Sequence, residues 1–302
     1  MEEKLLDEQI NELKKERNAL ILAHYYVDYG IQQIADLVGD SFELSRKVKN
    51  AKEDIIVFCG VRFMGESAKI LSPEKTVLMP SADAGCPMAD TITPEDIKAL
   101  RSEYPDAAVV CYVNSSAETK AQCDVCCTSS NAERVVRALD NKRIIFVPDQ
   151  NLGSYVAAKV PEKEIILFDG CCPIHNSMVR QDVITAKEKH PDALFLVHPE
   201  CKKEVAELAD FVGSTSQIID FAQNSDAKEF IIGTENGVID RLSRVCCQKN
   251  FYPLSQKFVC KDMKLPTKQD VVDALIYNSN EITLPEELIE KARLPLERMI
   301  SI

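Results

Sequence analysis

The sequence lacks several features that would each point to a familiar class of protein. No apolar run approaches about 18 residues, so we expect no segment to span a membrane. Neither a G-x-x-x-x-G-K-[ST] motif nor a G-x-G-x-x-G motif is present, which argues against nucleoside triphosphates and dinucleotides as ligands. Tryptophan is also absent, and this absence excludes nothing.

Flexible linkers and positive charge are scarce too. The 302 residues include only 10 glycines and 14 prolines, with no low-complexity run, so any lobes should pack closely together. Acidic residues outnumber basic ones by 48 to 36, giving a net charge of −12, and no basic stripe is present. Nucleic acids and anionic membranes are therefore not expected as partners.

Cysteine, by contrast, is abundant. There are 12 cysteines, and the first residues, MEEKLLDEQ, are too charged for an export signal. This combination predicts a reducing, cytoplasmic location, where thiols bind metal or remain buried as free groups.

The chain repeats itself with a period near 87 residues. PDALFLVHPEC from residue 191 aligns without a gap with PDAAVVCYVNS from residue 105, which places His198 on Tyr112, 86 positions earlier. A more divergent copy, NALILAHYYVD, places His24 88 positions before Tyr112. Each copy predicts a buried parallel strand, a helical stretch, an Asp, a short strand and a Ser/Thr turn.

The second half of each copy repeats as well and closes on a cysteine. IIVFCGVRFMG, IIFVPDQNLG and FIIGTENGV share a β-branched run, a polar turn and a helix. Cys172 follows Cys86 by 86 residues, and Cys260 follows Cys172 by 88. We therefore predict an α/β fold of three similar α/β/α lobes with short parallel sheets about a pseudo-threefold axis, and an active site at the centre.

We expect the lobes to divide the chain near the repeated cysteines. Lobe 1 would span residues 1–86, lobe 2 residues 87–172 and lobe 3 residues 173–262. Residues 263–302 read as two helices that pack back on lobe 1. Thr283 is the expected N-cap of the second helix, with Pro285 in its first turn.

Pairs of polar residues follow the first predicted strand of each lobe. Because ligands bind beyond the carboxyl ends of parallel strands, these six side chains should converge on one cavity. The pairs are His24 and Tyr26, Tyr112 and Asn114, and His198 and Glu200.

The Ser/Thr turns form a second element of the predicted site. Ser41, Ser129-Ser130 and Ser214-Thr215-Ser216 each precede a helical pattern, which is typical of N-caps. Helix N-termini with free amides also bind anions, and an acidic protein needs such neutral donors. The sequence Gly-Ser-Thr-Ser is therefore the best candidate for a phosphate site.

The repeated cysteines form the third element. Three thiolates, one from each lobe, can hold an iron–sulfur cluster and leave one iron open to substrate as a Lewis acid. Zinc is an alternative, because ligand softness alone does not separate the two. Cys171 adjoins Cys172, but the period selects Cys172. His175, three residues further on, is expected beside the metal.

Most of the remaining cysteines are expected to be structural. Most fall in or beside apolar strands, and free cysteine is among the most buried residue types. This group comprises Cys59, Cys111, Cys123, Cys126, Cys127 and Cys201, of which Cys59, Cys111 and Cys201 could instead lie behind the metal ligands; the adjacent pair Cys246 and Cys247 is assigned no role.

Several motifs together resemble one family along nearly the whole chain. They are HYY followed by IADLVGDS, then GVRFMGESAKIL, YVNSSAETKA, GCCPIH, the HPEC-to-GSTS stretch, GTENG and CKDMK. The sequence resembles quinolinate synthase, the iron–sulfur enzyme of NAD biosynthesis. The resemblance implies the same three-lobed fold with its site at the centre.

The resemblance also implies a reaction and its residues. The reaction is a transferase-type condensation of iminoaspartate with dihydroxyacetone phosphate to quinolinate, losing phosphate and two waters. Iminoaspartate would come from L-aspartate oxidase or a functional substitute. The cluster ligands would be Cys86, Cys172 and Cys260. The substrate pocket would contain His24, Tyr26, Ser41, Met64, Tyr112, Asn114, Ser129, His198, Glu200, Ser214 and Thr215.

Within this pocket the catalytic residues would be Glu200, Tyr26, His24 and His198. Glu200 would move protons as a base, its pKa raised by apolar walls, and Tyr26 and His24 would donate protons. The rival hypotheses are another iron–sulfur hydro-lyase, a metal sensor or store, and a phosphate-sugar binding module. The metal sensor or store would not need Glu200 and Tyr26, and the binding module would be metal-free.

Overall fold

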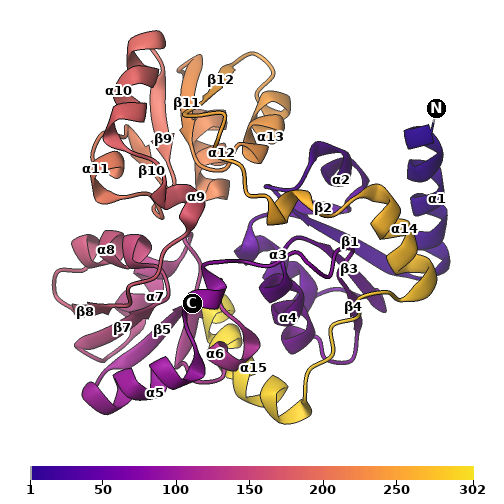
Figure 1. The fold of residues 1–302 in the computed structure, drawn as a ribbon, viewed down its shortest axis with the longest axis horizontal. Coiled ribbons are helices and arrows are strands. Elements are labelled where there is room, and N and C mark those ends of the chain that lie inside the picture. Colours follow the sequence, from indigo (N-terminus) through magenta and orange to yellow (C-terminus); the bar gives the residue numbers. More distant parts are fainter. Residues whose placement is uncertain (1) are drawn as a thin grey trace.

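Three separate sheets of four parallel strands build the protein, as seen in a computed structural model that describes residues 2–302. The strand orders are β2-β1-β3-β4, β6-β5-β7-β8 and β10-β9-β11-β12, so each sheet repeats the same topology. The three units surround a common centre (Figure 1). The predicted three-lobed α/β fold is confirmed.

Lobe 1 is the unit built on the first sheet. Its elements are α1 (Glu2–Glu16), β1 (Ala19–His24), α2 (Tyr29–Ile34), β2 (Leu37–Gly39), α3 (Ser41–Lys49), β3 (Ile55–Cys59), α4 (Arg62–Leu71), β4 (Thr76–Leu78) and the 3₁₀ helix η1 (Ala89–Thr91).

Lobe 2 is the unit built on the second sheet. Its elements are α5 (Pro94–Glu103), β5 (Ala108–Tyr112), α6 (Ala117–Lys120), β6 (Val125–Cys127), α7 (Ala132–Ala138), β7 (Arg143–Val147), α8 (Gln150–Lys159) and β8 (Glu164–Leu167).

Lobe 3 is the unit built on the third sheet. Its elements are α9 (Pro173–Asn176), α10 (Arg180–Lys189), β9 (Leu194–Val197), α11 (Lys203–Ala206), β10 (Phe211–Val212), α12 (Thr215–Asn224), β11 (Glu229–Gly233), α13 (Gly237–Val245), β12 (Asn250–Pro253) and the 3₁₀ helix η2 (Asp262–Lys264).

The two inner strands of each sheet consist almost entirely of buried apolar residues. All of β1, β3 and β5 is buried, as are all but the first residues of β7, β9 and β11. Continuous apolar runs of this kind are expected where helices cover both faces of a parallel sheet. The inner strands therefore determine where the chain leaves each sheet, on the side that faces the centre of the molecule.

The repeated Asp has the same structural role in all three lobes. One carboxylate oxygen of each Asp accepts the backbone N–H of a residue in the first strand, at 2.7–2.9 Å. The Asp N–H in turn donates to the carbonyl of the same strand residue. The pairs are Asp36 with Ile21, Asp124 with Val109, and Asp210 with Phe195. These bonds set the position of the short strand that follows.

The two C-terminal helices pack at different places. Helix α14 (Lys268–Tyr277) lies against α1 of lobe 1, whereas α15 (Glu286–Ser301) packs against α4 of lobe 1 and against β6 and α6 of lobe 2 (Figure 1). The lobe boundaries drawn from the sequence stay a prediction.

The expected N-cap at Thr283 is wrong. Helix α15 begins at Glu286 with Pro285 as its N-cap, and it makes no side-chain cap bond. The preceding Ile282 instead donates its N–H to the carbonyl of Val77 in β4, which keeps this segment extended. Among residues 2–302, no helix is long and apolar enough to cross a lipid bilayer.

Candidate active site

The first strand of every lobe ends at the centre of the molecule. In each sheet this strand lies between the short strand and the third strand, which is the point where the connections change direction. Ligands of open parallel sheets bind at such switch points. The residues that follow β1, β5 and β9 therefore approach one another although they lie far apart in the sequence.

These residues line a central cavity with about 690 Å³ of empty space. Thirteen of the fourteen residues expected at the site contribute to its wall. They are His24, Tyr26, Ser41, Met64, Cys86, Tyr112, Asn114, Ser129, Cys172, His198, Glu200, Thr215 and Cys260. Ser214 does not line the cavity, because its hydroxyl caps α12 instead.

The three period-related cysteines occupy equivalent positions around the cavity. Each stands just before a short helical segment, and its sulfur accepts hydrogen bonds from the backbone N–H groups two and three residues further on. Burial raises the pKa of Cys86 to about 12 and also raises the pKa of Cys172 and Cys260. Metal binding would replace these protons, and the N–H groups would then stabilise the thiolates.

Most other cysteines are buried away from the cavity. Cys59, Cys111, Cys126 and Cys127 are fully buried in the apolar core. Cys171, next to Cys172, does not line the cavity. The structure therefore separates the three cavity thiols from the structural ones.

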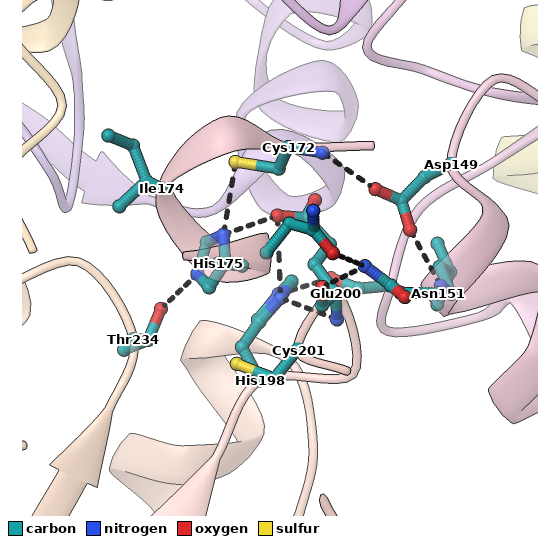
Figure 2. Close-up of polar contacts among 12 residues, drawn as sticks. Asp149, Asn151, Cys172, Ile174, His175, His198, Glu200, Cys201 and Thr234 are labelled. Carbon is teal, nitrogen blue, oxygen red and sulfur yellow. Dashed lines mark hydrogen bonds and ion pairs between the residues drawn. The ribbon is translucent and has the colours of Figure 1, made fainter. Parts of the chain in front are cut away.

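Cys172, His175 and Glu200 form a possible metal-binding group, with donor atoms within 4.8 Å of one another. His175 Nδ1 lies 3.2 Å from the Cys172 sulfur and 2.6 Å from Glu200 Oε2. The opposite nitrogen, Nε2, lies 2.8 Å from Thr234 Oγ1, as Figure 2 shows. His175 thus joins a cysteine of the cavity to its central carboxylate.

The expectation that the pKa of Glu200 would be raised is wrong. Burial by itself raises this pKa, but His175 and His198 nearby, with hydrogen bonds from His175 and Tyr112, lower it below the ordinary value. The Tyr112 hydroxyl donates to Glu200 Oε1 at 2.5 Å. Glu200 is therefore ionised at neutral pH and able to accept a proton.

The two strand-end histidines are neutral. Burial lowers the pKa of His24 and of His198 to about 3. In each ring, Nδ1 accepts a backbone N–H from the residue two positions on, Tyr26 or Glu200. The ring proton is therefore on Nε2, which makes that nitrogen a hydrogen-bond donor. His198 Nε2 lies 3.1 Å from Ser129 Oγ in lobe 2.

Tyr26 joins lobe 1 to lobe 3. Its hydroxyl lies 2.8 Å from the hydroxyls of both Thr215 and Thr234. Burial raises the pKa of Tyr26 well above its ordinary value, so the phenol keeps its proton. On the wall formed by lobe 2, the buried Oδ1 atom of Asn114 accepts no hydrogen bond from any residue in 2–302 and is free for a ligand.

The predicted N-caps are only partly right. Ser214 caps α12 in a capping box with Gln217. In lobe 1 the cap is Asp40, which accepts from the N–H groups of Phe42 and Glu43 and leaves Ser41 as the first helical residue. In lobe 2 the cap is Asn131, two residues after Ser129.

Sequence reasoning missed several residues of the cavity wall. Asp40, Thr128 and Glu235 line it, and Thr234 bonds both Tyr26 and His175. The GTENG motif contains Thr234 and Glu235, and it follows β11 at the central edge. Applying the strand-end argument to the third strand of each lobe would have identified Thr234 and Glu235.

The fold and the site together define a class: a three-lobed α/β protein whose lobes each contribute a cysteine and strand-end polar groups to one central cavity. Residues 8–301 match the family model described as "Quinolinate synthetase A protein". The chain belongs to this family.

Relatives named quinolinate synthase align over nearly their entire length. The protein from Caldicellulosiruptor saccharolyticus is 55% identical over 294 residues, which is 97% of each chain. That from Clostridium kluyveri is 53% identical over 302 residues, or 100% of each chain. That from Clostridioides difficile is 52% identical over 290 residues, covering 96% of this chain and 95% of the relative.

Proposed function

We propose that this protein is a quinolinate synthase that condenses iminoaspartate with dihydroxyacetone phosphate, releasing phosphate and two waters. The observation that carries the proposal is the convergence of three cysteines and three strand-end pairs on one cavity. The family relationship supports the same reaction.

Cys86, Cys172 and Cys260 would hold a [4Fe-4S] cluster. The fit is supported by one thiol per lobe, by backbone N–H groups directed at each sulfur and by the cavity that the three residues share. When bound, a cluster with three cysteine ligands supplies a Lewis acid through its fourth iron.

Glu200 would serve as the base that moves protons on the triose-derived substrate. Its carboxylate is ionised and held between His175 and Tyr112, which fixes its orientation toward the cavity. His24 and Tyr26 keep their protons and would donate hydrogen bonds or protons to departing oxygens.

Neutral donors would bind the anionic groups of the substrates. Within residues 2–302, no Lys or Arg side chain lines the cavity. Ser41 and Thr215 are the first residues of α3 and α12, and both residues line the wall. The backbone N–H groups at the N-terminus of α12 favour phosphate or carboxylate, whereas at α3 the N–H groups of Phe42 and Glu43 are already bonded to Asp40. Met64, Ser129 and Asn114 would complete the pocket.

The reaction is tested directly with the purified chain. Protein prepared without oxygen would be analysed for iron and sulfide and supplied with dihydroxyacetone phosphate and iminoaspartate, the latter made by an L-aspartate oxidase. We expect quinolinate in the product analysis. Metal-free protein, or water release without a new carbon–carbon bond, would contradict the proposal.

Three variants test the residue assignments. Cys260→Ala should lose the cluster, whereas Glu200→Gln should keep it and lose turnover. Cys126→Ala removes a buried thiol outside the cavity and should leave a loaded, active protein. Cluster loss in Cys126→Ala, or full activity in Glu200→Gln, would mean that the wrong residues have been chosen.

The proposed activity also implies a cellular setting. L-aspartate oxidase would supply iminoaspartate, and abundant free thiols suit the cytoplasm. A net charge of −12 favours small-molecule substrates over nucleic acid or membrane surfaces.

A further inference from the structure

Two buried carboxylates occupy equivalent positions in lobes 2 and 3. Asp149 stands two residues after β7, and Glu235 stands two residues after β11. The exposed fractions of these residues are 0% and 1%. Burying a charge is costly unless every oxygen finds a partner, so the partners indicate what each carboxylate does.

Each carboxylate uses its two oxygens on two different segments. Asp149 Oδ1 accepts the N–H of Leu152 in α8 at 2.6 Å, and Oδ2 accepts the N–H of Cys172 at 3.0 Å. Figure 2 shows the bond between Asp149 and Cys172. One side chain therefore ties a cysteine of the cavity to the body of lobe 2.

Lobe 3 repeats this arrangement with a longer side chain. Glu235 Oε2 accepts the N–H of Gly237 at 2.6 Å, and Oε1 accepts the N–H of Cys260 at 3.2 Å. Lys264 Nζ lies 3.4 Å from Glu235 and also donates to the carbonyl of Tyr26. The same bridge therefore arises from two different acidic residues 86 positions apart.

Lobe 1 lacks this bridge because Val61 occupies the equivalent position after β3. Its cysteine loop keeps the backbone bond that all three lobes share, here from the N–H of Arg62 to the carbonyl of Ala84. A carboxylate reaches this loop from lobe 3 instead: Asp262 accepts the N–H of Gly85 at 3.3 Å. Among residues 2–302, no carboxylate accepts the N–H of Cys86 itself.

The bridges hold the backbone from which each sulfur projects. The N–H groups of Ile174 and His175 bond to the Cys172 sulfur, and those of Asp262 and Met263 bond to the Cys260 sulfur. Fixing the backbone at the cysteine keeps these donors aligned with the sulfur. Hydrogen-bond partners behind a metal ligand orient it and tune the metal in this way.

We propose that Asp149 and Glu235 are positioning residues for Cys172 and Cys260, holding both ligands in place for the cluster. This inference rests on the proposed function. An amide cannot replace either carboxylate, because both oxygens accept N–H groups and an amide nitrogen accepts none. Asp149→Asn and Glu235→Gln therefore each break one of the two bonds with little change in volume.

The test compares these variants with Glu66→Gln after loading without oxygen. Glu66 is also buried, and it accepts the N–H of Ala117 and bonds Arg62 without contacting a cysteine loop. We expect the two positioning variants to lose iron to a chelator about 10- to 100-fold faster than the unmodified protein, and to show an altered cluster EPR spectrum. Glu66→Gln should match the unmodified protein.

Several outcomes separate the possible failures. Unmodified protein without iron and sulfide would overturn the proposed function itself. A loaded protein whose Asp149→Asn and Glu235→Gln variants retain iron and the EPR spectrum unchanged would overturn this inference, as would equal iron loss from Glu66→Gln. If the amide variants do not fold, Glu235→Asp keeps a carboxylate on a shorter chain. It should then lose iron at an intermediate rate, and an unchanged rate would again overturn the inference.

Discussion

Lobes 1 and 2 share one continuous apolar core, whereas lobe 3 has cores of its own. The shared cluster includes buried residues of the first two sheets together with Leu296 and Met299 of α15. Lobe 3 has two clusters, and the only buried residue from another lobe in them is Tyr25 of lobe 1. The comparison applies to residues 2–302.

Lobe 3 meets its neighbours at the cavity mainly through polar contacts. The contacts include Tyr26 with Thr215 and Thr234, Ser216 with Asp40, His198 with Ser129, and Asn151 with the carbonyl of Glu200. Directional bonds of this kind position groups precisely but contribute less net stability than apolar burial. The difference between the lobes thus separates the part that holds the molecule together from the part that arranges the site.

The largest expected effect comes from the shared core. Leu296→Ala should lower the free energy of unfolding by about 2–5 kcal/mol, because it leaves a cavity between two lobes. Denaturant titration would measure the loss. Leu294→Ala, in the same helix but 52% exposed, is the matched control and should change stability by less than about 0.5 kcal/mol. Equal losses would contradict the shared core.

The second largest effect is expected from acid, which should lower the free energy of unfolding through the buried histidines at the boundary of lobe 3. The pKa of both His24 and His198 is about 3 in the folded protein and near 6.5 when unfolded, so the unfolded state binds more protons between these values. Stability should therefore fall as the pH decreases below about 6.5, by about 2 kcal/mol per histidine at pH 5. The lowered pKa of Glu200 acts in the same direction at lower pH.

Denaturant titrations from pH 7.5 to pH 5 would measure this dependence. His198→Asn removes one of the two histidines and should reduce the loss of stability between pH 7.5 and pH 5 by about 2 kcal/mol. An equal loss of stability in His198→Asn and in the unmodified protein would show that His198 is not buried in the neutral form.

Substituting the repeated Asp tests whether equivalent bonds contribute equally to the stability of different lobes. Asp124→Ala and Asp210→Ala each remove a bond to the strand N–H and an ion pair, with Arg101 and Lys187 respectively. We expect similar losses of about 1–2 kcal/mol in both lobes, measured by denaturant titration. If only one of the two variants loses stability, the equivalent Asp residues contribute different free energies in the two lobes.

The smallest effect is expected at the polar boundary itself. Ser216→Ala removes the 2.5 Å bond to Asp40 and should cost about 0.5–1 kcal/mol. Hydrogen exchange should show faster opening of α12, with α15 unchanged. Ser102→Ala, an exposed serine on α5, serves as the control and should alter neither.

The sequence predicted what depends on the repeat. The strands around His24, Tyr112 and His198, the parallel sheets and the shared register of the three cysteines all follow from patterns with a fixed period. Buried apolar runs and strand-end polar residues are local features, so they can be recognised without coordinates.

The features that were predicted wrongly or missed depend on contacts between segments far apart in the sequence. The pKa of Glu200 is lowered by His175, 25 residues earlier, and by Tyr112, 88 residues earlier. The N-terminus of α15 is decided by pairing beside β4 rather than by Thr283. The bridge from Glu235 to Cys260 likewise joins residues whose proximity only the folded chain reveals.

The position of α15 has a consequence for biosynthesis. A ribosome makes residues 286–301 after all three sheets, yet this helix fills the seam between the first two lobes. Those lobes emerge early and keep apolar surface uncovered while the third is still being translated. The interface between the first two lobes to be synthesised is thus completed only by a helix that is synthesised at the end.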